Sequence, residues 1–484
     1  MRSETNRWLV LVLVCIAQFM VILDATIVNV ALPSIQHGLH FSPTSLQWIV
    51  NAYALVFGGF LLLGGRASDL FGRQRLFIAG VALFTVASLV NGIATSSGVL
   101  IGGRALQGLG AALVSPAALS IVTTTFAEGK ERTKALGIWS AIAAGGGAFG
   151  LILGGLLTET LSWRWVFFVN LPIGIAAALL SLRFIPNTRS EEKPETADVA
   201  GAVTVTGGLL VLVYAVVKAQ AYGWGSGKTI GLFAIAVALL AAFIAVESRS
   251  KAPLIRLSIF RMRSLSSSNL SMLLVASGMF SMFYFASIYV QEILGYGPLK
   301  AGFAFLPFTF GIVIGAGAAQ SLIGRLGIRV VTAAGLTIAT VGLALFTQIS
   351  VHGTYWSEIF PGVSVMSIGM GLTFVPLTLL ATTNVANEDA GLASGIFNTS
   401  QQIGGALGLA VLSTLAASRT SSLAKSGVSA PEALTRGYHV AFAVGAAFLA
   451  SGLAVLLIGI RKRHVEAIDA NAEGTEPVLA ELAA

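Results

Sequence analysis

The sequence predicts an all-α polytopic membrane protein: two six-helix bundles with two additional transmembrane helices between them. Three observations support this class: composition, the number of long apolar runs, and an internal repeat. The 484 residues are 55% hydrophobic and 10% charged, against about 25% charged in soluble proteins, and the mean hydropathy is +0.85. So few charges cannot cover a water-facing surface. Soluble enzymes and disordered chains are therefore excluded, and the single cysteine, Cys15, excludes a disulfide scaffold.

The apolar runs predict fourteen spans. A helix crosses the roughly 30 Å hydrocarbon core in about 20 residues. The first run is longer than a cleavable signal, carries Asp24 and is followed by further spans, so we expect it to be retained. The spans are expected at about 8–31, 46–65, 76–95, 99–125, 134–157, 163–184, 199–218, 228–248, 268–292, 300–322, 330–350, 357–380, 392–416 and 436–460.

Lysine and arginine predict the orientation. With the amino terminus inside, 21 of these 29 residues fall on the cytoplasmic side and seven on the outer side, while Arg104 lies within a span. Basic residues concentrate in cytoplasmic loops. We therefore expect a multi-pass protein of the plasma (inner) membrane with both termini in the cytoplasm. The net charge of +8 belongs to these loops and does not indicate a nucleic-acid partner.

An internal repeat explains the even number of spans. Seven positions between Ala135 and Gly150 recur 258 residues later, between Ala393 and Gly408, and a shorter echo relates 64–73 to 324–329. Chance similarity among 55 glycines is the alternative. The repeat links spans eight apart, whereas two six-helix halves place equivalent spans six apart. Two accessory helices therefore separate the halves. The expected parts are a bundle at 1–184, a linker and accessory helices at 185–265, a bundle at 266–460 and a cytoplasmic tail at 461–484.

Two charged side chains lie inside the spans. Asp24 is the one acid placed deep in a span, and Arg104 lies about a turn and a half inside the fourth. Such a residue costs about 2.5–3.5 kcal/mol on insertion scales and usually serves function. Burial favours the neutral form of a carboxyl group and a nearby guanidinium favours the charged form. We expect Asp24 to couple protons and Arg104 to modulate it. The alternative is a structural ion pair that holds two helices together.

The segment 64–75 is expected to form a cytoplasmic loop between the second and third spans. Its glycines permit a tight turn and a close backbone approach. Its acid can accept hydrogen bonds from the start of a helix, and its arginine can pair with Glu128 or Glu131. A charged latch of this kind stabilises one of two conformations, whereas an ordinary basic loop is the alternative. The latch residues are Gly65, Asp69, Gly72 and Arg73.

Several of these stretches together resemble a known family. The stretch 23–33, the segment 64–75, the run 104–110 and the glycine-rich fifth span resemble signature motifs of the major facilitator superfamily. With fourteen expected spans, the chain is similar to the multidrug:proton antiporter branch, as is its run 163–174. The resemblance covers nearly the whole chain. It implies a major-facilitator-type fold with alternating access. It also implies that Asp24 takes part in proton or cation coupling, that Arg104 is a base in the cavity, and that Asp69 and Arg73 form the latch.

The chain departs from this family in two places. The antiporter motif of the fifth span normally contains Gly-Pro, but here Gly150 is followed by Leu151, and the helix loses the expected kink. Some multidrug relatives carry a second membrane acid in the C-terminal half, which helps with doubly charged cations. Spans nine to fourteen lack a central acid. We therefore expect neutral or singly charged amphipathic substrates.

Side chains that bind substrate are expected near the midplane, between the halves. Aromatic rings can stack on a substrate or bind its cation. Amides within a span are expected to face the interior, because lipid leaves them unsatisfied. The candidates are Trp48, Tyr53, Gln107, Phe280, Tyr284, Asn398 and Gln401.

Two other motifs carry no expected function. The run 225–229 is similar to a phosphate-binding loop, but Tyr222 replaces its first glycine and the run lies between two apolar spans. His37 and His40 alone make no metal site. We expect no metal, cofactor, nucleotide or nucleic-acid partner, and no enzymatic activity. The expected partners are protons, membrane lipid and an amphipathic small molecule, with a monomer as the functional unit.

These observations predict proton-coupled efflux of hydrophobic or amphipathic small molecules, such as drugs or antibiotics, by alternating access. Two alternatives stay open. Proton-linked or facilitated uptake of a metabolite shares every motif except an intact antiporter span. A non-transporting receptor or scaffold could also keep this fold.

Overall fold

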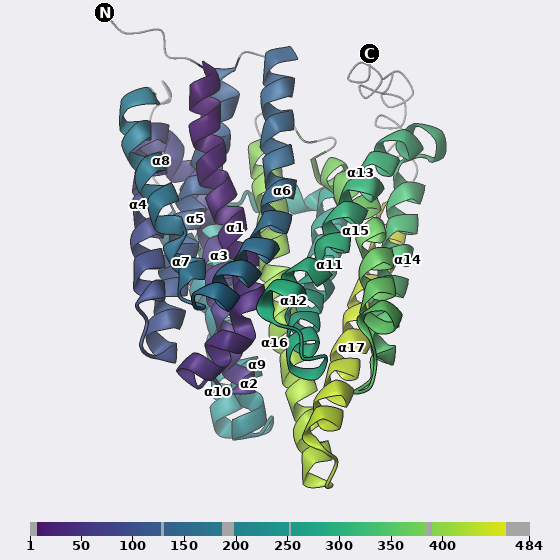
Figure 1. Cartoon of the computed structure of the whole chain (residues 1–484). Coiled ribbons are helices and arrows are strands. Elements are labelled where there is room, and N and C mark those ends of the chain that lie inside the picture. Colours follow the sequence, from purple (N-terminus) through teal and green to yellow (C-terminus); the bar gives the residue numbers. More distant parts are fainter. Residues whose placement is uncertain are drawn as a thin grey trace, which may run out of the picture. The chain divides into compact units, whose positions relative to one another are not determined.

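The regular elements of the chain are helices (Figure 1). The computed structural model describes residues 7–126, 130–185, 198–250, 253–382, 385 and 390–460, and no strand occurs in these ranges. Most of the predicted linker before the accessory helices, and the tail 461–484, lie outside the described residues. The fold class predicted from the sequence is thus confirmed as helical throughout the described ranges.

The helices cluster into two units, each with its own interior. Unit 1 comprises Met1–Arg256 with Tyr296–Phe303, and unit 2 comprises Leu257–Gly295 with Ala304–Ala484. The helices before Arg256 are α1 (Arg7–Leu39), α2 (Pro43–Leu46), α3 (Trp48–Phe71), α4 (Arg73–Gly92), α5 (Ser97–Thr125), α6 (Lys130–Thr160), α7 (Trp165–Phe168), α8 (Asn170–Phe184), α9 (Val199–Tyr222) and α10 (Gly227–Arg249). The elements after Arg256 are η1 (Leu257–Arg261), α11 (Arg263–Ile288), η2 (Tyr289–Ile293), α12 (Pro298–Ala304), α13 (Leu306–Leu326), α14 (Ile328–Leu345), η3 (Phe346–Gln348), η4 (Tyr355–Ile359), α15 (Phe360–Thr382), α16 (Ala390–Lys425) and α17 (Ala430–Gly459).

Thirteen helical segments among the described residues are long and apolar enough to cross a membrane. Each of them overlaps one predicted span. The remaining predicted span, 134–157, falls within α6, a helix of 31 residues in which several side chains lie outside the described set. The helix α6 runs through Leu151 without interruption, as expected for a helix that lacks the proline of the antiporter motif.

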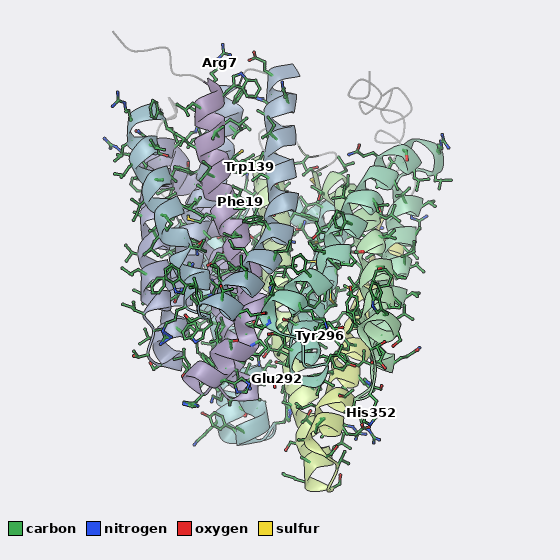
Figure 2. The ribbon with its side chains drawn as sticks, viewed as in Figure 1. Arg7, Phe19, Trp139, Glu292, Tyr296 and His352 are labelled. Atoms are coloured by element: carbon green, nitrogen blue, oxygen red, sulfur yellow. The ribbon has the colours of Figure 1, made fainter. Side chains whose placement is uncertain are left out.

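The interior of unit 1 is an apolar layer beside a polar one. Large side chains from α4 and α5, among them Phe77, Phe84 and Val114, are fully buried against Val14 and Met20 of α1. Figure 2 labels Arg7 and Phe19 along α1 and Trp139 on the neighbouring α6. The Phe19 ring lies 5.7 Å from that of Phe149, also on α6. This packing fixes α1 against α5 and α6, and so fixes the place of Asp24.

One pair of glycines from the internal repeat, Gly150 and Gly408, lies at equivalent helix contacts. In unit 1, a Cβ atom added at Gly150 of α6 would clash with Thr26 of α1. In unit 2, Cβ atoms added at Gly404 and Gly408 of α16 would clash with the α11 backbone at Leu273 and Ser277. Small residues let transmembrane helices approach closely. The repeat therefore preserves one helix-pair contact in each unit.

The shorter echo of the repeat marks a second equivalent feature, and it corrects one expectation. The segment 64–75 is not a loop: α3 continues to Phe71, and Gly72 alone separates it from α4. Gly64 lies inside α3, where its missing side chain lets the α5 backbone approach at Ala112. Gly327 separates α13 from α14 in the same way, and the φ angles at Gly72 and Gly327 are 97° and 80°. Both junctions use a backbone conformation that L side chains rarely adopt.

Alanine at either junction is expected to destabilise the protein. Gly72→Ala and Gly327→Ala place a Cβ atom on a backbone with positive φ and extended ψ, which costs about 1–3 kcal/mol. Thermal unfolding of the purified protein measures the loss. Gly102→Ala is the matched control, because it lies within α5 with no atom within 4 Å of an added Cβ, and should stabilise by about 0.5–1 kcal/mol. Equal stabilities for the junction variants and the wild type would contradict the strained backbone.

The accessory helices α9 and α10 belong to unit 1, and α9 packs against α3. The Trp48 ring of α3 lies 6.3 Å from the Tyr214 ring of α9. A Cβ atom added at Gly59 of α3 would clash with Thr206 of α9. The two accessory helices α9 and α10 also pack against each other. Gly59 therefore makes the slot into which α9 fits.

Candidate functional site

A buried acid and a buried arginine meet in unit 1. Asp24 lies midway along α1 and is 0% exposed, and Arg104 of α5 is 1% exposed. The Nη1 atom of Arg104 donates to Oδ2 of Asp24. The structure thus brings together the two charged residues that the sequence placed within the spans. Burial of this kind requires that each charge be paired and hydrogen-bonded.

Two amides complete the surroundings of the Asp24 carboxylate. Oδ1 of Asp24 accepts from Nε2 of Gln107 at 2.7 Å and from Nδ2 of Asn170 at 3.0 Å. Gln107 lies one turn beyond Arg104 on α5, and Asn170 begins α8. The carboxylate therefore receives three donors from two helices other than its own. This arrangement stabilises one negative charge inside the bundle.

Arg104 has contacts that do not depend on Asp24. Its Nε donates to the carbonyl oxygen of Ile49 at 2.9 Å. Its guanidinium carbon lies 4.3 Å from the centroid of the Tyr53 ring, within the range of a cation–π interaction. Nη1 also donates to Oε1 of Gln107 at 2.8 Å. The guanidinium is therefore held by a backbone carbonyl, an aromatic ring and an amide as well as by the acid.

A second layer of polar side chains, which sequence reasoning missed, orients the amides. Ser88 Oγ of α4 accepts from Nε2 of Gln107 at 2.8 Å, and Asn91 of the same helix donates to Oε1 of Gln107 at 2.8 Å. Both α4 residues are fully buried. The sequence could have indicated them, because polar side chains within a predicted span need hydrogen-bond partners. The same argument would have identified Asn170.

Three oxygen atoms at this site have no hydrogen-bond partner among the described residues. They are Oδ1 of Asn91, Oδ1 of Asn170 and the hydroxyl oxygen of Tyr53, and all are buried. An unpaired buried polar atom is costly, and these three oxygens all belong to residues of the network around Asp24 and Arg104. Asn170 is notable, since its other amide atom already donates to Asp24.

The cavity candidates are dispersed. Tyr53 and Gln107 belong to the buried network around Asp24, whereas Trp48 packs on accessory helix α9. In unit 2, the Phe280 ring covers Gly405. Tyr284 is 3% exposed, with its ring 5.1 Å from that of Phe285.

Two amide candidates lie on α16. Asn398 is exposed and donates to Ser394 of its own helix at 3.1 Å, and Gln401 is half-buried. These positions do not by themselves define a binding site, so the substrate-binding role of all seven candidates stays a prediction.

The four latch residues lie at the α3–α4 junction. Gly65 is in α3, Gly72 is the junction and Arg73 begins α4, while the side chain of Asp69 is outside the described set. Of the two acids considered for Arg73, Glu128 lies outside the described residues. Glu131 forms an ion pair with Arg7 at 3.1 Å, with both side chains 57% exposed. The latch role stays a prediction.

The fold and this site define a helical membrane protein whose first unit buries an acid–arginine pair within an amide network. Residues 14–409 match the sequence model of the Major Facilitator Superfamily. The chain therefore belongs to that superfamily. The family resemblance inferred from the sequence motifs is confirmed.

Relatives and solved structures agree with this assignment. The chain is 41% identical to the puromycin resistance protein of Streptomyces alboniger over 95% of this chain and 92% of that protein. It is also 41% identical to the cephamycin export protein of Amycolatopsis lactamdurans, covering 92% and 91%. A crystal structure of the peptide transporter POT matches with a TM-score of 0.68 at 16% identity, over 94% of each chain. That structural likeness shows the fold alone.

Proposed function

We propose that this protein exports hydrophobic or amphipathic small molecules in exchange for protons. The observation that carries the proposal is the fully buried Asp24 carboxylate, held by Arg104 and two amides in a chain of this superfamily. Similarity to proteins named for puromycin resistance and cephamycin export supports antibiotics as the substrate class. The chain acts as a transporter and carries out no chemical conversion.

The proton step is an exchange of partners at Asp24. When a proton binds, the carboxyl group loses its charge and the bond from Nη1 of Arg104 weakens. Arg104 keeps the Ile49 carbonyl and the Tyr53 ring, neither of which needs that bond. These two contacts therefore hold the guanidinium in position while Asp24 is neutral.

Asn170 provides the complementary adjustment. Its Nδ2 donates to charged Asp24, whereas its Oδ1 has no partner in the described residues. A half-turn of the amide would present Oδ1 to accept the O–H of the protonated acid. One residue can thus satisfy Asp24 in both protonation states.

The membrane potential and pH gradient supply the energy. Each proton that moves inward across 100 mV releases about 2.3 kcal/mol. We place the protein in the plasma (inner) membrane with both termini in the cytoplasm. It would act as a monomer, without a cofactor, and alternate between access from the two sides.

Inside-out membrane vesicles test the direction of coupling. With an acidic lumen, protons leave toward the former cytoplasmic face, and an added substrate such as puromycin should accumulate in the lumen. A one-for-one exchange with a neutral compound permits at most about tenfold accumulation per pH unit. An ionophore that collapses the gradient should abolish it. Accumulation driven only by an alkaline lumen would indicate uptake in the cell and contradict the proposal.

A further inference from the structure

Two further buried acids lie together at one end of the accessory helices. Asp198 caps the N-terminus of α9 and is 9% exposed, and Glu247 lies in the last turn of α10 and is 4% exposed. Neither takes part in the network around Asp24. This end of α9 and α10 is the one expected to face the cytoplasm.

Each carboxyl group uses one oxygen and leaves the other without a partner. Oδ1 of Asp198 accepts from the backbone N–H of Gly201 at 2.7 Å. Oε2 of Glu247 accepts from the backbone N–H of Ile255 at 3.2 Å. Oδ2 of Asp198 and Oε1 of Glu247 are buried and have no hydrogen-bond partner among the described residues.

The two unpartnered oxygens lie around one small space. An ideal Cβ atom built on Gly201 would lie 2.7 Å from Oε1 of Glu247 and 3.2 Å from Oδ2 of Asp198. Both oxygens are therefore close to the same point, which stays empty because residue 201 is glycine.

Neither carboxylate forms an ion pair with a basic residue among the described residues. Of the described residues, Asp198 is the charged group that acts on Glu247. Arg249 and Arg256, the nearest described basic residues in sequence, are exposed, and Lys251 lies outside the described residues. No group of three metal-ligating acids, histidines or cysteines occurs in the described part of the chain. Divalent cations such as Ca²⁺ take six to eight oxygen ligands, so two carboxyl groups make a poor metal site.

A proton would supply the donor that both oxygens lack. When one carboxyl group is protonated, it becomes a donor and the other remains an acceptor. Two carboxyl groups that share a site hold a proton for this reason. We propose that Asp198 and Glu247 bind one proton between them, as a site distinct from Asp24.

This site acts on the connection between the units. The same Glu247 side chain holds Ile255, and the chain passes into unit 2 two residues later, at Leu257. Loss of the shared proton would set two negative charges against each other beside this bond. The inference concerns proton binding and stability, so it does not depend on whether the protein exports drugs.

Infrared spectroscopy of the full-length protein in lipid tests the proton directly. The carbonyl band of a protonated carboxyl group should be present in the wild type at neutral pH. E247Q should lose one carboxyl equivalent of this band, because its amide takes the place of the acid. E432Q is the matched control: it removes an exposed carboxylate, paired with Arg436 on α17, and should leave the band unchanged. An E247Q band equal to that of the wild type would overturn the proposal.

Thermal unfolding against pH separates a proton site from a merely structural contact. The folded protein holds a proton that the unfolded chain releases, so wild-type stability should fall as pH rises. One proton changes the unfolding constant by up to about tenfold per pH unit. E247Q and D198N keep a donor and an acceptor at every pH and should lack this contribution, while E432Q should follow the wild type. The proton site would be overturned if E247Q and the wild type showed the same dependence of stability on pH, so that E247Q lost stability equally at every pH. It would also be overturned if Na⁺ or K⁺ changed the stability of the wild type at constant pH.

Discussion

Asp24→Asn should abolish proton-driven accumulation of substrate, reducing it to the level of vesicles without the protein. Asparagine can still accept from Gln107 and Asn170, which donate to Asp24 in the wild type, but it cannot take up and release a proton. Exchange of labelled for unlabelled substrate across the membrane needs no net proton movement. That exchange should persist, because an amide resembles the protonated acid. The two assays, run on the same vesicles, separate lost coupling from lost protein.

Two further variants show whether a loss of transport by D24N comes from lost coupling or from misfolding. Asp24→Asn leaves Arg104 buried without its countercharge, so D24N/R104Q removes both charges and should fold while remaining uncoupled. Glu432→Gln is the control, since it removes an exposed acid and should transport like the wild type. Proton-driven accumulation by D24N equal to that of the wild type would show that Asp24 is not the coupling group, and the ion pair would then be structural.

Arg104→Gln should have the largest effect on stability. It leaves Asp24 buried without a cation and removes the contacts to Ile49 and Tyr53. Removing one partner of a buried pair costs about 3–5 kcal/mol. The double variant D24N/R104Q should be more stable than either single variant, because no unpaired charge remains. Chemical unfolding of the four proteins in the same detergent measures this coupling as a double-mutant cycle.

An exposed ion pair supplies the comparison. Arg7 and Glu131 also join two helices of unit 1, but both side chains are 57% exposed. Exposed pairs contribute about 0–1 kcal/mol, so Arg7→Gln should change stability little. Additive losses in the Asp24–Arg104 cycle would contradict a direct energetic link between the two buried charges.

The sequence predicted the architecture because membrane insertion imposes strong rules on composition. Apolar runs of about 20 residues define spans, and thirteen of the fourteen predicted spans overlap a described helical segment that could cross a membrane. The echo between Gly72 and Gly327 correctly indicated an equivalent feature in the two halves. Its interpretation as a loop was wrong, because hydropathy falls where charges gather, whereas the helix continues until the backbone adopts positive φ at Gly72.

The site was predicted in part. A lone acid and a lone arginine within spans are conspicuous, and the structure places Asp24 beside Arg104. Ser88, Asn91 and Asn170 escaped notice because uncharged polar residues also occur singly in spans, bonded to their own helix, as Thr332 is to the Ile328 carbonyl. Only the packing of α4 and α8 against α1 and α5 shows which polar residues converge.

The slot at Gly59 bears on how a protein of this kind could be shortened. Excising α9 and α10 would uncover a groove on α3 where Thr206 now sits against Gly59, and would strip Tyr214 from Trp48. Lipid chains would fill that notch less densely than a fitted side chain does. A derivative without α9 and α10 would therefore need a bulkier residue at position 59. The surface of α3 is thus shaped to fit the accessory helices.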